Sequence, residues 1–211
     1  MEEKQIVFNA TKKYLVKGNT KNPKAILFIF HGYGQLVKFF SKKFSVLERE
    51  YKLIFPEALS KFYLGYDFKK VCASWLTKVD KEIEIENNLV YLDKIWENEN
   101  QEGLAVKVIA FSQGVSMASR WLAKQKISFN QLVLWGGKFP LDINEKAFNY
   151  LNENETSVDL VAGDKDFLID NKQIEVQIEV LRTYFNASNI NEHVFSGGHE
   201  IDEALLVKLF N

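Results

Sequence analysis

The residues best suited to chemistry lie around Ser112, in the motif AFSQG at residues 110–114. The motif directly follows an apolar run at residues 106–111 that predicts a buried strand, and it directly precedes a helical pattern. A sharp turn between strand and helix pushes a serine hydroxyl out at the top of a sheet, in a strained backbone conformation. Ala110 and Gly114 are small enough for the two backbones to approach there. We therefore predict that Ser112 is a nucleophile, with a helix N-cap as the competing interpretation.

A serine hydroxyl is a poor nucleophile at neutral pH, so the chain must also supply a base and a carboxylate that orients it. The sequence has three histidines. His199 is the best placed, because two glycines precede it and leave its imidazole on a loop beyond a strand end, where α/β enzymes assemble their sites. His193 lies inside an expected strand at residues 191–195, which favours a packing or edge position, and His31 follows another expected strand.

Two aspartates compete for the role of the orienting acid. Asp164 and Asp166 both follow an expected strand at residues 157–162. Asp164 stands beside a glycine, where aspartate is a common turn residue. Asp166 precedes an apolar segment that can shield a carboxylate from water, so we favour Asp166. The order Ser112, Asp166, His199 is also the chain order of α/β-hydrolase triads.

Backbone N–H groups near Ser112 could stabilise the negative charge that develops during acyl transfer. The N–H of Gln113 is the first candidate, because it opens the helix directly after the serine. The glycine-rich segment HGYGQ at residues 31–35 follows an expected strand, and its Tyr33 N–H is the second candidate. Taken alone, this segment could also be a plain loop.

Short β-rich runs alternate with amphipathic helical stretches, as a mostly parallel sheet covered by helices requires. We therefore expect a three-layer α/β/α fold. Strands buried on both faces are expected at residues 25–30, 52–55, 106–111, 131–135 and 157–162, with weaker strands at 5–8, 13–16 and 191–195, the first two of these as a hairpin. Helices are expected at residues 81–97, 114–124, 174–185 and 200–210.

Composition limits the classes of protein to which the chain can belong. Its 211 residues, 46% of them hydrophobic, suffice for one domain over residues 1–211. The net charge of −1 argues against a nucleic-acid partner. Cys72 is the single cysteine, which excludes an internal disulfide and a cysteine-based metal cluster and suits a reducing compartment. The charged residues 1–5 lack the apolar core of a signal peptide, and no apolar run spans a membrane, so we expect a cytoplasmic protein.

These motifs resemble those of the phospholipase/carboxylesterase family of α/β-hydrolases, which includes acyl-protein thioesterases and bacterial carboxylesterases. The resemblance rests on HGYG at residues 31–34, FPEA at 55–58, SW at 74–75, FSQG at 111–114, GDKD at 163–166 and GH at 198–199. It implies an α/β-hydrolase fold, a triad of Ser112, Asp166 and His199, and an oxyanion hole formed by Tyr33 and Gln113. The segments between the expected strands are short apart from the stretch after residue 55, so we expect no cap domain, and we expect no cofactor or metal. Ala110 stands where the family usually has glycine. Gln35 stands where many members have aspartate, so the resemblance leaves open whether the protein acts on acyl-protein substrates.

The leading hypothesis is a hydrolase of small carboxylic esters or thioesters that forms a covalent acyl-enzyme. A non-catalytic binding protein of the same fold is the alternative, and a thiol hydrolase using Cys72 is a poorer one. The sequence leaves open whether the protein forms a homodimer.

The long unassigned stretch at residues 56–79 carries Phe62, Tyr63 and Trp75, which we expect to line the acyl pocket, with packing under the loop as the competing interpretation. Without a cap, short to medium acyl chains should be preferred.

Overall fold

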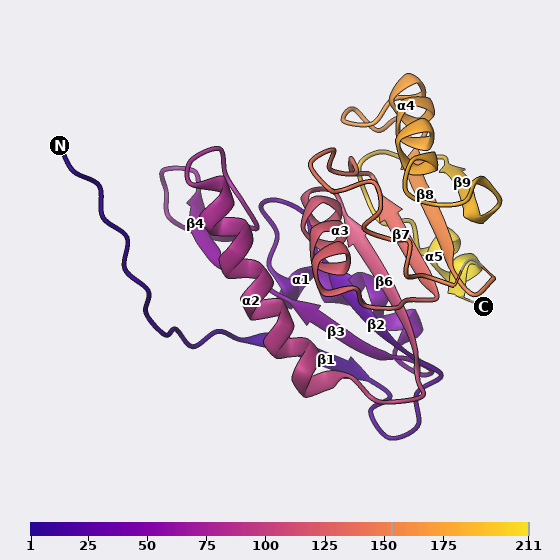
Figure 1. The fold of residues 1–211 in the computed structure, drawn as a ribbon, viewed down its shortest axis with the longest axis horizontal. Coiled ribbons are helices and arrows are strands. Elements are labelled where there is room, and N and C mark those ends of the chain that lie inside the picture. The colour runs from indigo at the N-terminus through magenta and orange to yellow at the C-terminus, as the bar shows by residue number, and fades with distance from the viewer. Residues whose placement is uncertain (153, 211) are drawn as a thin grey trace.

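A computed structural model describes residues 1–152 and 154–210, and its centre is a seven-stranded sheet (Figure 1). The strand order is β1-β3-β2-β6-β7-β8-β9. β1 runs antiparallel to β3, and every other neighbouring pair is parallel. The strands are β1 (Tyr14–Gly18), β2 (Ala25–Phe30), β3 (Lys52–Pro56), β6 (Ala105–Phe111), β7 (Gln131–Trp135), β8 (Ser157–Gly163) and β9 (Ile190–Phe195). The expected mostly parallel sheet is confirmed.

Helices cover both faces of this sheet and complete the expected three layers (Figure 1). One face packs against α2 (Lys81–Glu99), α3 (Gln113–Gln125) and α4 (Asn171–Arg182). The other packs against α1 (Val37–Phe40), the 3₁₀ segment η1 (Ser41–Leu47) and α5 (Glu203–Phe210). A short 3₁₀ turn, η2 (Ala187–Asn189), precedes β9. None of the described helices is long and apolar enough to cross a membrane.

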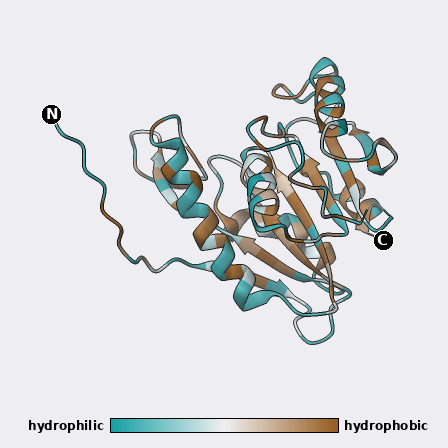
Figure 2. Cartoon of the chain, in the orientation of Figure 1, coloured by the Kyte–Doolittle hydropathy of each residue, from teal (hydrophilic) through white to brown (hydrophobic). Residues whose placement is uncertain are grey.

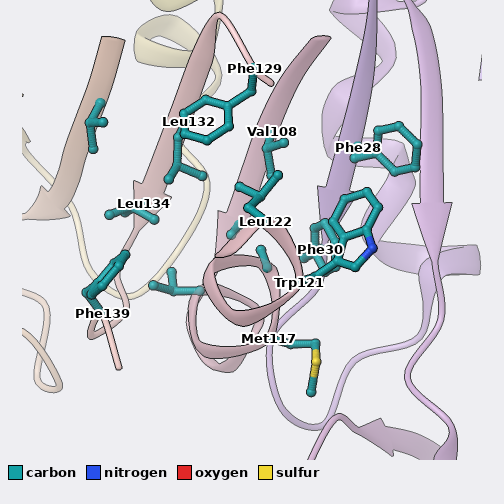
Figure 3. Close-up of a cluster of buried hydrophobic side chains, with 14 of the residues drawn as sticks. Phe28, Phe30, Val108, Met117, Trp121, Leu122, Phe129, Leu132, Leu134 and Phe139 are labelled. Atoms are coloured by element: carbon teal, nitrogen blue, oxygen red, sulfur yellow. The ribbon is translucent and has the colours of Figure 1, made fainter. Parts of the chain in front are cut away.

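The central strands are apolar on both faces, which appears as brown strands between more polar helices in Figure 2. In β2, Phe28 and Phe30 face the α3 side, where both rings contact the ring of Trp121, at centroid distances of 5.1 and 5.8 Å (Figure 3). Leu27 and Ile29 alternate to the opposite face. All five side chains are fully buried. Because such interiors are close-packed, the sheet offers rigid strand ends on which a site can be built.

Two local expectations were wrong or incomplete. Residues 5–8 do not pair with residues 13–16, because β1 pairs with β3 instead and the N-terminal segment extends away from the body of the protein up to the contacts of Lys12 with Leu59 and Lys13 with Tyr91 (Figure 1). The side chains of residues 6–8 are exposed, so their apolar pattern packs against nothing in the fold. In the stretch after β3, β4 (Ser60–Leu64) and β5 (Lys70–Ser74) form an antiparallel hairpin outside the main sheet, which we did not predict.

Candidate active site

Ser112 stands between β6 and α3 in the strained conformation that the motif predicts. Its φ of 55° and ψ of −120° are unfavourable for a residue with a side chain. The Ser112 N–H donates to the carbonyl oxygen of Trp135 at 2.8 Å, which fixes the turn against β7. Gly114 leaves the necessary room, since a Cβ there would lie 2.8 Å from the carbonyl oxygens of Phe30 and His31. The turn therefore holds the Ser112 hydroxyl at the carboxyl end of the sheet.

His199 and Asp166 complete a continuous hydrogen-bonded series with this serine. The Nε2 atom of His199 lies 2.9 Å from Ser112 Oγ, and its Nδ1 atom lies 2.8 Å from Asp166 Oδ2. This arrangement fits a neutral imidazole that donates from Nδ1 and accepts the serine proton at Nε2. Asp164 points elsewhere, because its Oδ1 accepts the Gly197 N–H at 2.9 Å. The structure thus brings together the three side chains expected from the sequence, with Asp166 and not Asp164 beside the imidazole.

The carboxylate of Asp166 is oriented by the loop that follows β8. Its Oδ1 accepts the N–H of Leu168 at 2.8 Å and that of Ile169 at 3.3 Å. The side chain is only 1% exposed, so this carboxylate is shielded from water, but of the three apolar residues after it only Ile169 is buried, while Phe167 and Leu168 are exposed. The ring of Phe111 lies 4.7 Å from the His199 ring, centroid to centroid, and supports the imidazole from one side.

Gly136 is a site residue that the sequence reasoning missed. It follows β7 with a φ of +58°, and a Cβ on it would lie 3.1 Å from His199 Nδ1 and 3.2 Å from Asp166 Oδ2. Only glycine gives this backbone both the positive φ and the space beside the two side chains. The pair Gly136-Gly137 at the carboxyl end of a predicted buried strand was the feature of the sequence that could have identified it.

Two backbone donors beside Ser112 have no acceptor among residues 1–152 and 154–210. These are the N–H groups of Tyr33 and Gln113, the two candidates for an oxyanion hole. The loop that carries Tyr33 lies against the serine, since a Cβ on Gly32 would be 3.0 Å from Ser112 Cβ. Its shape is fixed in part by the Gln35 side chain, whose Oε1 accepts the Gly32 N–H at 2.8 Å.

Trp75 lies in the core instead of on the surface of the site. Its side chain is fully buried, and its indole N–H donates to the carbonyl oxygen of His31 at 2.8 Å. The Trp75 backbone N–H donates to Gln113 Oε1 at 2.9 Å, while Gln113 Nε2 donates to the Leu76 carbonyl at 2.7 Å. Trp75 therefore joins the loop after β5 to both oxyanion segments, and it does not face the hollow beside Ser112.

His31 is a buried structural residue beneath the Tyr33 loop. Its Nδ1 donates to the Gly32 carbonyl oxygen at 2.7 Å, and its Nε2 accepts the Ala58 N–H at 3.0 Å. Burial lowers the pKa of His31 to about 4, against smaller opposing effects of the Gly32 hydrogen bond and the Glu57 charge. The imidazole is therefore neutral at physiological pH and ties two loops together.

The structure separates the two expected pocket residues of the hairpin. Phe62 is half-buried, and its ring stacks on the Tyr33 ring with centroids 5.2 Å apart. Tyr63 is 54% exposed, and its ring contacts Phe68 at 5.4 Å instead. Phe62 is thus adjacent to the candidate oxyanion loop, whereas Tyr63 lies on the opposite side of the strand from it.

A hollow of about 450 Å³ opens at Ser112. Its walls come from Lys81 at the start of α2, from Ser112 and the first turns of α3, from residues 136–140 after β7 and from residues 168–169 after β8. A larger hollow of about 790 Å³ runs along α4, but it is lined only by residues between 175 and 183 and contains none of the candidate site residues. The chemistry at Ser112, not size, identifies the candidate active site. In the described part of the chain, no group of three or more His, Cys, Asp or Glu side chains could hold a metal ion.

The sheet, its covering helices and the strand-to-helix turn at Ser112 define an α/β-hydrolase fold. A sequence model of the phospholipase/carboxylesterase family matches residues 11–211, so the chain belongs to this family. No curated protein matches the chain in sequence.

Solved structures with the same fold include esterases and a thioesterase. Acyl-protein thioesterase 2 of Zea mays has a TM-score of 0.72 and 16% identity, over 94% of this chain and 96% of that one. Esterase PE8 has a TM-score of 0.63 and 17% identity, over 93% and 97%. A phospholipase/carboxylesterase of Dyadobacter fermentans has a TM-score of 0.63 and 15% identity, over 96% and 97%. These structures show the same fold, and membership of the phospholipase/carboxylesterase family supports a hydrolase.

Proposed function

We propose that the protein hydrolyses carboxylic esters or thioesters through a covalent acyl-enzyme formed on Ser112. The observation that carries this proposal is the hydrogen-bonded series Asp166–His199–Ser112, with distances of 2.8 and 2.9 Å, ending on a serine in a strained turn. Strain at one residue costs on the order of 1–3 kcal/mol and persists where it serves a site. Membership of the phospholipase/carboxylesterase family supports the same chemistry.

In the proposed first step, Ser112 Oγ attacks the substrate carbonyl carbon while His199 Nε2 takes its proton. Asp166 stabilises the imidazolium that forms, and the N–H groups of Tyr33 and Gln113 bind the oxyanion. When the tetrahedral intermediate collapses, the bond to the leaving group breaks and His199 returns the proton to the departing alcohol or thiol. Water then attacks the acyl-enzyme with the same base, which releases the carboxylic acid and restores Ser112.

The open hollow beside Ser112 supports a preference for short to medium acyl chains. Its volume is about 450 Å³, and Phe139, Leu168 and Ile169 form the apolar part of its wall. We keep Phe62 as a wall beside Tyr33, with Tyr63 further along the same hairpin. For Trp75 we propose a different role, in which it positions the oxyanion loop through the His31 carbonyl.

Replacement of the serine tests the proposal most directly. We expect Ser112→Ala to abolish covalent labelling by a fluorophosphonate probe and to lower the kcat for an aryl ester by about 10⁶-fold, because loss of a triad member leaves only oxyanion and binding contributions. Ser119→Ala is the matched control, since Ser119 lies on the same helix and its hydroxyl has no hydrogen-bond partner among the described residues. If folded Ser112→Ala protein labels and turns over like the wild type, another nucleophile is responsible.

A further inference from the structure

The hollow beside Ser112 has an unusual concentration of positive charge. Of its twelve lining residues, Lys81, Arg120 and Lys138 are cationic and none is acidic. The whole chain has a net charge of −1, so this wall differs in sign from the rest of the molecule. Clefts lined by charge of one sign attract ligands of the other sign.

Two of the three cations are paired with one carboxylate, that of Asp142, which is not among the residues that line the hollow. Arg120 lies on the same face of α3 as Ser116, to whose carbonyl oxygen it donates at 2.9 Å. It also donates to both oxygens of Asp142, at 2.7 and 3.3 Å, and Lys81 Nζ lies 3.7 Å from Asp142 Oδ2. Burial alone would raise the pKa of Asp142, but Arg120 and Lys81 outweigh it and hold that pKa below its ordinary value. The single negative charge of Asp142 is therefore shared between the positive charges of Arg120 and Lys81.

Lys138 is the cation most available to a ligand. It is exposed, and no described residue forms a hydrogen bond or an ion pair with its ammonium group. Its backbone is nevertheless fixed close to the nucleophile, because a Cβ on the preceding Gly137 would lie 2.4 Å from the Ser112 carbonyl oxygen. Lys138 therefore stands on a rigid anchor between two hollows, the one that begins at Ser112 and a second one of about 430 Å³ that Asp170 and Lys172 also line.

The lining of the hollow indicates which part of a substrate would occupy it. Ser112 is a lining residue but His199 is not. Because His199 Nε2 must protonate the leaving group, that group remains beside the imidazole. An acyl chain placed in the hollow would then share it with the apolar side chains of Leu168, Ile169 and Phe139 and with the three cations.

We propose that the preferred substrate carries a carboxylate at the far end of its acyl chain, bound by Lys138 and Arg120. This inference rests on the proposed ester hydrolysis and names its substrate class: half-esters or half-thioesters of dicarboxylic acids. Such a remote charge is bound equally in the ground state and the transition state, so its contribution appears mainly in KM.

The test compares mono-4-nitrophenyl adipate with 4-nitrophenyl hexanoate, which have acyl chains of equal carbon number. We expect the wild type to favour the adipate in kcat/KM by about tenfold, a preference that shrinks at high ionic strength because salt screens exposed charges. Lys138→Gln should lower the adipate-to-hexanoate ratio about fivefold through KM, and Lys138→Glu should reverse it. Lys43→Gln makes the same charge change on η1, remote from the hollow, and should leave the ratio unchanged.

The outcomes separate the two proposals. In one outcome, the wild type hydrolyses both esters in a Ser112-dependent way with an adipate-to-hexanoate ratio of kcat/KM near one that Lys138→Gln does not change. This outcome overturns the carboxylate inference and leaves ester hydrolysis intact. The carboxylate inference is also overturned if Lys43→Gln lowers the adipate-to-hexanoate ratio as much as Lys138→Gln does, because the net charge of the protein would then be the cause. Absence of Ser112-dependent hydrolysis of either ester contradicts the proposed function itself. A carboxylate on the leaving group, tested with the acetyl ester of 3-hydroxybenzoate against phenyl acetate, should bring no comparable gain.

Discussion

Two aspartate–histidine pairs, one within the neighbouring strands β8 and β9 and one just beyond them, have the same distance between nitrogen and oxygen and different surroundings. Asp159 in β8 lies 2.8 Å from the Nε2 atom of His193 in β9. Asp166 and His199, which follow these strands, are also 2.8 Å apart. An acid and an imidazole at hydrogen-bond distance are therefore not enough to define a catalytic pair.

What distinguishes the pairs is their place along the sheet. Asp159 is buried within β8, where it also accepts hydrogen bonds from Gln131 at 2.8 Å and Asn191 at 3.2 Å, all from side chains on neighbouring strands. Its carboxylate is satisfied by the interior, as a buried charge must be. Asp166 lies past the strand end, and the second nitrogen of its histidine faces Ser112. The carboxyl end of the sheet thus converts a structural pair into a candidate catalytic one.

Replacing the two histidines should separate the pairs most strongly. We expect His199→Gln to lower the kcat for an aryl ester by about 10⁴- to 10⁶-fold, because the base is lost. His193→Gln should leave kcat within about twofold and lower the free energy of unfolding by about 1 kcal/mol, the ordinary contribution of a hydrogen bond. Ester kinetics and urea unfolding measure the two effects. Equal losses of activity in both variants would contradict the assignment.

Replacing the acids gives the next largest contrast. Asp166→Asn should lower kcat by about 10⁴-fold, because the imidazole loses the carboxylate that sets its tautomer. Asp159→Asn should spare kcat and lower the free energy of unfolding by about 1–3 kcal/mol, since an amide nitrogen would face hydrogen-bond donors. Asp164→Asn, measured in parallel, should have a much milder effect on kcat than Asp166→Asn. If Asp164→Asn is the more damaging change, the orienting acid is Asp164.

The apolar runs before Ser112 and Asp166 were informative because each of these residues follows a strand that is buried on both faces, whereas His199 follows β9, which is largely half-buried or exposed. Strands buried on both faces appear as continuous apolar runs, and β7 has the expected bounds of residues 131–135. Helix starts were less accurate. α4 begins at residue 171 instead of 174, because the Asp170 side chain accepts the Gln173 N–H at 2.8 Å and caps the helix earlier. α5 begins at residue 203 instead of 200, after Asp202, whose side chain accepts the Leu205 N–H at 2.7 Å.

Other features depend on contacts between distant segments, which a local pattern does not reveal. Gly136 is required because His199 and Asp166 pack against it. Trp75 was expected in the acyl pocket because it is aromatic and lies in a long connection, yet its side chain fills the core. Asp159 interrupts an apolar strand, and only the positions of Gln131, Asn191 and His193 on adjacent strands explain why a carboxylate is tolerated there.

The third histidine, His31, extends the comparison, because it is buried and neutral and forms no hydrogen bond with an acid among the described residues. Its pKa is about 4 in the folded protein against 6.5 for an ordinary histidine, so the unfolded chain binds more protons between these values. Stability must therefore fall as pH drops from about 6.5 towards 4, by up to about 3 kcal/mol from this residue. Urea unfolding at about pH 7.5 and pH 5 measures the loss. His31→Asn should be less stable at the higher pH but should show about 2 kcal/mol less pH dependence than the wild type.

The smallest effect concerns the surroundings of each pair. A hollow opens at Ser112, whereas Asp159 is joined through the Gln131 side chain to the Leu209 carbonyl oxygen of α5. Each methylene buried in the hollow contributes up to about 0.8 kcal/mol, or roughly fourfold in kcat/KM. Activity on unsubstituted 4-nitrophenyl esters should therefore rise with acyl length and level off at medium chains, because the hollow is open and holds about 450 Å³.

Leu168 allows this wall to be tested without disturbing the triad, since its contact with Asp166 is through the backbone N–H and survives substitution. Leu168→Ala should flatten the rise with acyl length more than it lowers turnover of the acetyl ester, because the shortest acyl group leaves the wall uncovered. Leu141→Ala is the matched control, as Leu141 is 74% exposed and does not line the hollow. A rise that continues through the longest soluble chains, or an unchanged profile in Leu168→Ala, would mean that the acyl chain follows another surface, such as the Phe62 side of Tyr33.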